Sequence, residues 1–114
     1  MTDKYLKQIS EEFPNIREHQ EDDLEWWNEG LDFLHCGKIV EAENKFKMLT
    51  LSQPQHYDGY RGLAWVYEKS KDFSKAKFFI DLAIEKALLS SKKGKDDWIL
   101  EDLKEEQNRI SSNL

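Results

Sequence analysis

Two stretches of this 114-residue chain carry the same residue pattern at a fixed offset of 34 positions. An aromatic, a small and an aromatic residue stand at 26, 30 and 33, and again at 60, 64 and 67. An alanine and, four residues later, a large apolar residue follow at 42 and 46, and again at 76 and 80. Because a helix returns to the same face every three or four residues, each stretch predicts a pair of amphipathic helices. The offset predicts two copies of one helical unit.

The same periodicity, with its glycines and prolines, predicts six helices in all. Pro14 ends the first helix, and Gly37 favours a left-handed cap at the end of the second. Asp22 with Glu25 resembles a capping box for that second helix, and Asp72 is a candidate cap for the fifth. The predicted ranges are 2–13, from after Asp22 to near Cys36, 39–51, 57–70, 74–90 and 96–110.

The spacing and the period together resemble the tetratricopeptide repeat family over roughly residues 23–90. The resemblance implies an all-α fold, a right-handed superhelix of antiparallel helix pairs with about six helices. It divides one domain into an N-terminal helix and acidic linker (1–22), two repeats (23–56 and 57–90) and a C-terminal capping helix (91–114). Glu29, Ile80 and Leu88 depart from the leucine, phenylalanine and proline usual in the family. Two repeats are fewer than the roughly three that make a stable stack, so the flanking helices are expected to supply the missing layers.

The repeated residue types predict how the helices pack. Gly30 and Ala64 are expected to be small because the second helix of each unit crosses close to them. Phe46 is expected to fill the seam to the next pair of helices. The aromatic residues of both repeats are expected to lie in the core.

The resemblance also implies a concave groove made by the first helix of each repeat. The groove would expose several apolar side chains, which commonly mark an interaction site. Two interpretations remain open: the groove receives a peptide or amphipathic helix from another protein, or it is covered by the N-terminal helix or a second copy of this chain. The candidate groove comprises Trp27, Asn28, Leu31, Leu34, His35, Asp58, Arg61, Trp65, Glu68 and Lys69.

Charge restricts the partners further. The chain carries a net charge of −6, and residues 1–25 hold most of the excess. Such a surface disfavours nucleic acid and anionic membranes as partners, and it either aids solubility or attracts a basic partner. A single cysteine, a charged N-terminus and the absence of a long apolar run predict a soluble, cytoplasmic protein.

No arrangement typical of catalysis or cofactor binding is found. His35 and Cys36 are adjacent, so on a helix their side chains point in different directions. The sequence has no glycine-rich phosphate loop and no paired-cysteine metal motif. We therefore expect no enzymatic activity, no metal and no cofactor. The expected function is that of a protein-interaction module, either an adaptor or a chaperone-like protein, with a structural subunit or homodimer as the alternative.

Overall fold

A computed structural model describes residues 3–18, 24–90 and 97–114, and these residues form six α-helices and no strand. The predicted all-α fold with six helices is thereby confirmed, and each helix end lies within two residues of its expected position. The capping role expected of Asp22 falls outside the described residues. The helices are α1 (Asp3–Glu12), α2 (Leu24–His35), α3 (Ile39–Ser52), α4 (Asp58–Lys69), α5 (Phe73–Ser90) and α6 (Asp97–Ser111).

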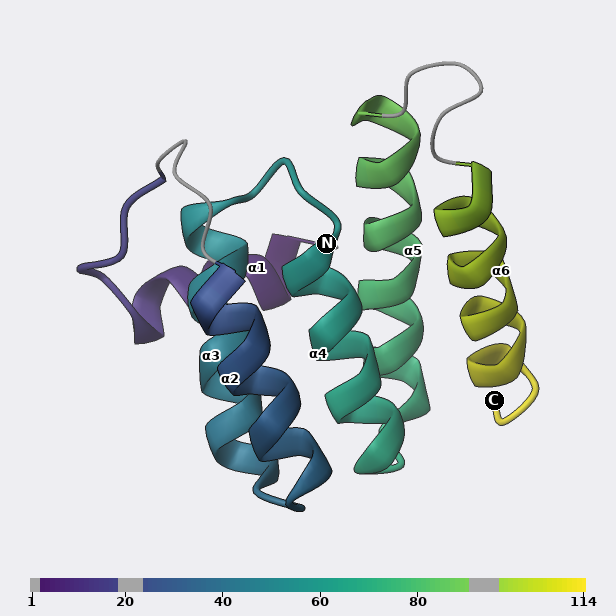
Figure 1. The fold of residues 1–114 in the computed structure, drawn as a ribbon, viewed down its shortest axis with the longest axis horizontal. Coiled ribbons are helices and arrows are strands. Elements are labelled where there is room, and N and C mark those ends of the chain that lie inside the picture. The colour runs from purple at the N-terminus through teal and green to yellow at the C-terminus, as the bar shows by residue number, and fades with distance from the viewer. Residues whose placement is uncertain (1–2, 19–23, 91–96) are drawn as a thin grey trace.

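From α2 onward, the most extensive helix contacts are those between helices that follow one another in the chain. Helices α2, α4 and α6 run downward in Figure 1, and α3 and α5 run upward, so successive helices are antiparallel. Helix α2 also contacts α4. Within the part of the chain that the structure describes, no helix is long and apolar enough to cross a membrane.

The turns after α2 and α4 have the same geometry, 34 residues apart. The amide N–H of Lys38 donates to the carbonyl of Phe33, and that of Asp72 donates to the carbonyl of Tyr67. Both turns place one residue in the left-handed region, Gly37 at φ 77° and Lys71 at φ 64°. This is the Schellman arrangement, in which a left-handed residue lets the chain satisfy the last carbonyls of a helix. The predicted cap at Gly37 is confirmed.

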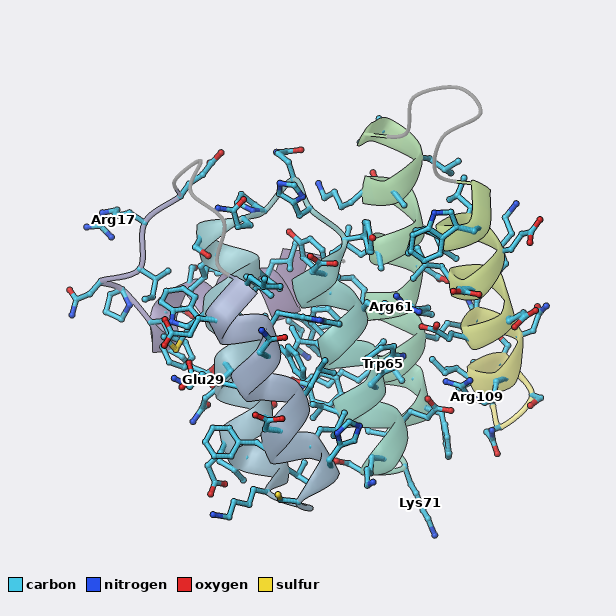
Figure 2. The ribbon with its side chains drawn as sticks, in the orientation of Figure 1. Arg17, Glu29, Arg61, Trp65, Lys71 and Arg109 are labelled. Atoms are coloured by element: carbon cyan, nitrogen blue, oxygen red, sulfur yellow. The ribbon has the colours of Figure 1, made fainter. Side chains whose placement is uncertain are left out.

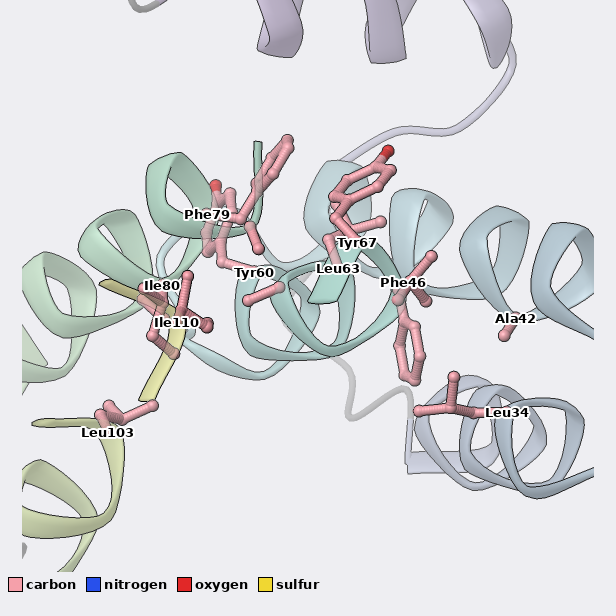
Figure 3. Close-up of a cluster of buried hydrophobic side chains, with 14 of the residues drawn as sticks. Leu34, Ala42, Phe46, Tyr60, Leu63, Tyr67, Phe79, Ile80, Leu103 and Ile110 are labelled. Carbon is pink, nitrogen blue, oxygen red and sulfur yellow. The ribbon is translucent and has the colours of Figure 1, made fainter. Parts of the chain in front are cut away.

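The core runs continuously from α2 to α6, as Figure 3 shows from Leu34 to Leu103 and Ile110. Phe46 of α3 is completely buried and fills the space between α2 and α4. A Cβ atom added to Gly30 would lie 2.6 Å from the Phe46 ring, and one added to Gly62 would overlap the same ring. Both predictions, the close crossing at Gly30 and the seam filled by Phe46, are confirmed.

The aromatic residues of the two repeats are not buried equally. Tyr60 and Tyr67 are 4% and 5% exposed, whereas Trp26 and Phe33, 34 positions earlier, are only partly buried. The expectation that these aromatic residues lie in the core holds for Tyr60 and Tyr67, whereas Phe33 packs against the core from its edge and Trp26 is partly exposed. Helix α3 covers one side of α4, but α1, the helix before α2, packs elsewhere.

Helix α1 crosses behind α3 in Figure 1 and contacts α3 and α5. Its Ile9 is 3% exposed and belongs to the core. Helix α1 therefore covers the side of the array formed by the second helices of the two pairs. The side chains of the candidate groove belong to α2 and α4.

Candidate functional site

Helix α4 presents three polar or aromatic side chains of the candidate groove along one stripe. Arg61, Trp65 and Glu68 are spaced by four and three residues, so they share a face of the helix. Figure 2 shows Arg61 and Trp65 directed toward α6, with Arg109 reaching toward α4 from the other side. The site thus includes α6 as well as the two helices that the sequence identified.

The upper part of this face is closed by Glu106 of α6. Its carboxylate accepts hydrogen bonds from Nε and Nη2 of Arg61, at 3.0 and 2.6 Å, and from Nε1 of Trp65 at 2.8 Å. The side chains of Arg61 and Glu106 are 14% and 8% exposed. The Arg61 guanidinium also lies 4.7 Å from the centre of the Trp65 ring, within cation–π range. We call these three residues the Arg61–Glu106–Trp65 cluster.

A second bidentate pair lies one turn below this cluster. Nε and Nη2 of Arg109 donate to the Glu68 carboxylate at 2.6 and 2.8 Å. The hydrogen bond to Glu68 raises the pKa of Arg109 above its ordinary value. The Arg109 side chain is 53% exposed, so water screens this pair far more than the pair above it.

The opposite wall comes from α2. The Trp27 ring lies 5.5 Å from the Phe46 ring and 5.7 Å from the Trp65 ring, measured between centroids. Leu31 is partly buried against the core, and Leu34 is 7% exposed. These contacts bury much of the apolar surface that the sequence placed in an open groove, because the two indoles pack against each other and Trp27 packs on Phe46.

An open cleft remains where α2, α4 and α6 approach their C-terminal ends. It has a volume of about 450 Å³ and is lined by Leu34, His35, Trp65, Glu68, Lys69 and Arg109. Five of these six residues belong to the candidate groove. Leu34 and Trp65 supply apolar surface, Glu68 and Arg109 form the ion pair, and His35 and Lys69 are exposed. We refer to it as the α2–α4–α6 cleft.

The remaining candidates lie away from this cleft. Asn28 is exposed on α2, and Asp58 is partly buried at the start of α4. Neither lines the cleft. The structure therefore gathers the lower half of the candidate groove into one concave surface and closes the upper half with Glu106.

The cleft is suited to holding an apolar side chain beside polar backbone or charged groups. Its apolar surface is flanked by an imidazole, an ammonium group and a guanidinium. Among the described residues, no group of three or more His, Cys, Asp or Glu side chains is arranged to hold a metal ion.

Sequence reasoning missed Glu106 and Arg109. They stand 45 and 41 positions from their partners on α4, and the family resemblance implies only a capping role for the last helix. The order of the charged residues along the two helices could have indicated this pairing. Arg61 precedes Glu68 on α4 and Glu106 precedes Arg109 on α6, so the two stripes are complementary when the helices run parallel.

Comparisons with models of protein families, with curated proteins and with solved structures found no match to this chain.

Proposed function

We propose that the chain is a protein-interaction module of the tetratricopeptide type, an adaptor or chaperone-like protein that binds a segment of another protein. The observation that carries the proposal is the α2–α4–α6 cleft, in which five residues expected to bind a partner line one concave surface. An apolar surface with polar sides is typical of sites that hold a peptide side chain.

The finer description of the fold belongs to the same proposal. Two antiparallel helix pairs, α2–α3 and α4–α5, repeat their turn geometry after 34 residues. The small residues Ala42 and Ala76 are completely buried in both pairs. These features support a helical-repeat superhelix ended by α6.

In the proposed mode of binding, an apolar side chain of the partner contacts Leu34 and the exposed part of Trp65. Lys69 and His35 contact the partner's backbone carbonyls or acidic groups at the edge of the cleft. Trp65 itself is a poor residue to mutate, because its indole N–H is held by Glu106 and its ring packs on Trp27. Lys69 lines the cleft and is exposed, so it can be changed without disturbing the core.

The test is affinity capture from the native cell's lysate with three baits: wild type, Lys69→Glu and the control Lys71→Glu. Lys71 is also exposed but does not line the cleft. A protein retained by wild type and by Lys71→Glu, but lost from Lys69→Glu, supports binding in the cleft. Identical lists from all three baits, or no captured protein, contradict it.

Light scattering after size exclusion identifies the alternative occupant. A mass of two chains that only Lys69→Glu reduces to one chain identifies a second copy of the protein as the ligand of the cleft. The function is then that of a structural homodimer.

A further inference from the structure

Helix α1 packs on the rest of the chain with one face, on which Leu6 is partly buried beside a central stripe. Tyr5, Ile9 and Glu12 are spaced by four and three residues, and together they present an aromatic, an aliphatic and an acidic group. Ile9 is buried, Tyr5 is partly buried and Glu12 reaches α3. A single stripe of this kind is the pattern by which an amphipathic helix binds a groove.

The surface that receives α1 has an aromatic half. The Tyr5 ring lies edge-on to Phe78 at 5.1 Å and tilted to Phe79 at 6.1 Å, both on α5. Nζ of Lys75 lies 5.2 Å from the Tyr5 ring centroid and 4.6 Å from that of Tyr67. An aromatic residue on the incoming helix therefore meets two rings and a cation.

The other half of the surface is charged. Nζ of Lys47 lies 2.8 Å from the Glu12 carboxylate and 3.3 Å from that of Glu43, and the Lys47 side chain is 10% exposed. The Tyr67 hydroxyl donates to Glu43 at 2.5 Å, and burial together with this bond raises the pKa of Tyr67. A buried ammonium group is stabilised by acidic partners, and Glu12 of the incoming helix makes a closer contact with Lys47 than Glu43 does. We call Lys47, Tyr67, Lys75, Phe78 and Phe79 the α1 dock.

Few other contacts tie α1 to the chain. Among residues 4–18, only Glu12 forms a hydrogen bond with a later part of the described chain, to Lys47. After α1, the amide N–H of Ile16 donates to Phe13 and the Arg17 guanidinium donates to Pro14, both within the same segment. Residues 13–23 connect α1 to α2, and eleven extended residues span about 36 Å. That reach is comparable with the dimensions of the molecule, 35 × 32 × 32 Å.

We propose that the α1 dock also binds α1 of a second copy of the chain, so that two copies exchange their first helices. The second copy is the occupant that fits, because an identical helix makes the same aromatic, aliphatic and ionic contacts in either chain. Exchange of an identical element loses no contact and is a low-cost route to dimers. This interaction uses α3, α4 and α5 and does not depend on the cleft or on its ligand.

The pair of Glu12 with Lys47 allows a test by charge exchange. In the Glu12→Lys chain, the helix and its own dock both carry a lysine at the contact. In the Lys47→Glu chain, both carry a glutamate. When the two variants exchange helices, one dock regains the original pair and the other receives the reversed pair.

The two variants are unfolded together in urea, refolded as an equimolar mixture and measured by size exclusion with light scattering. We expect the mixture to shift to twice the 13.6 kDa mass of one chain. The control is the double variant Glu12→Lys/Lys47→Glu, whose helix matches its own dock as in wild type, so at the same concentration it is expected to form no more dimer than wild type does. A mixture that stays at the mass of one chain while the double variant folds overturns the proposal.

Wild type supplies a second measurement if Lys47→Glu fails to fold beside Glu43. Its own helix and the exchanged helix make equal contacts, so the dimer fraction after refolding rises with protein concentration. Wild type that refolds to one chain at every concentration overturns the proposal.

Discussion

The Arg61–Glu106–Trp65 cluster joins α4 to α6, and we predict that its two charged members are strongly coupled in stability. Replacing Glu106 with leucine leaves the Arg61 guanidinium and the Trp65 N–H without their acceptor. Breaking a buried ion pair on one side costs about 3–5 kcal/mol. Because the Arg61 side chain keeps 14% exposure, water reaches part of it, and we expect the lower end, about 3 kcal/mol. Arg61→Leu, which strands the Glu106 carboxylate, is expected to cost about as much.

The double variant Arg61→Leu/Glu106→Leu removes both charges from the same place. Apolar replacement of a whole buried pair is often neutral, but Trp65 Nε1 remains without a partner, which costs about 1–2 kcal/mol. The double variant is therefore expected to lose far less stability than the sum of the single variants, with a coupling free energy of at least about 2 kcal/mol. Urea unfolding followed by circular dichroism at constant pH measures all four chains.

The pair of Arg109 with Glu68 is the matched control, since it joins the same two helices with the same bidentate geometry. Its Arg109 side chain is 53% exposed, so a cycle of Arg109→Leu and Glu68→Leu is expected to give less than about 1 kcal/mol. If the Arg61 and Glu106 variants each cost less than about 1 kcal/mol and add, burial does not strengthen the cluster, and our reasoning is refuted.

Three further predictions concern the core and the turns. Gly62→Val places side-chain carbons against the buried Phe46 ring and is expected to cost about 2–3 kcal/mol in urea unfolding, a loss that Phe46→Leu in the same chain should partly restore. Lys71→Gly removes a left-handed non-glycine residue and should stabilise by up to about 1 kcal/mol, whereas Lys71→Ala should not. Burial, with Glu18 and Glu85 nearby, raises the pKa of Tyr60 from 10.0 to about 12, so the neutral phenol stabilises the fold below pH 10 and that stabilisation is lost as the pH rises to 12. Over that window, wild type should lose about 2–3 kcal/mol more than Tyr60→Phe, and parallel pH profiles would count against the assignment.

The helices could be predicted from the sequence because their signals are local. Apolar spacing of three and four residues, Pro14 and Gly37 lie within or beside the elements they define. The close crossing at Gly30 and the seam filled by Phe46 were also predictable, since the small and large residues recur in both units. Predicting these parts of the fold requires only the pattern of neighbouring residues and the 34-residue offset.

The placement of α1 could not be predicted in the same way. Its stripe of Tyr5, Leu6 and Ile9 predicts an amphipathic helix but does not identify the surface that covers it. The contact of Glu12 with Lys47 spans 35 positions, and the sequence contains several other acids and lysines that could pair. Helix α1 was therefore a candidate cover for the groove, whereas in the structure it lies on α3 and α5.

The two copies of the sequence pattern are buried to different extents because the helices that pack on them differ. Phe46 of α3 packs against Gly62 of α4, and that contact brings the two helix pairs together. The residue 34 positions before Gly62 is Asn28, which is exposed. A polar side chain at that position suits the free end of a stack and does not admit a ring like that of Phe46. Trp26 and Phe33 are partly exposed for a related reason. Among the described helices, α2 packs on α3 and α4, whereas α1 lies on a different face and does not cover these two side chains.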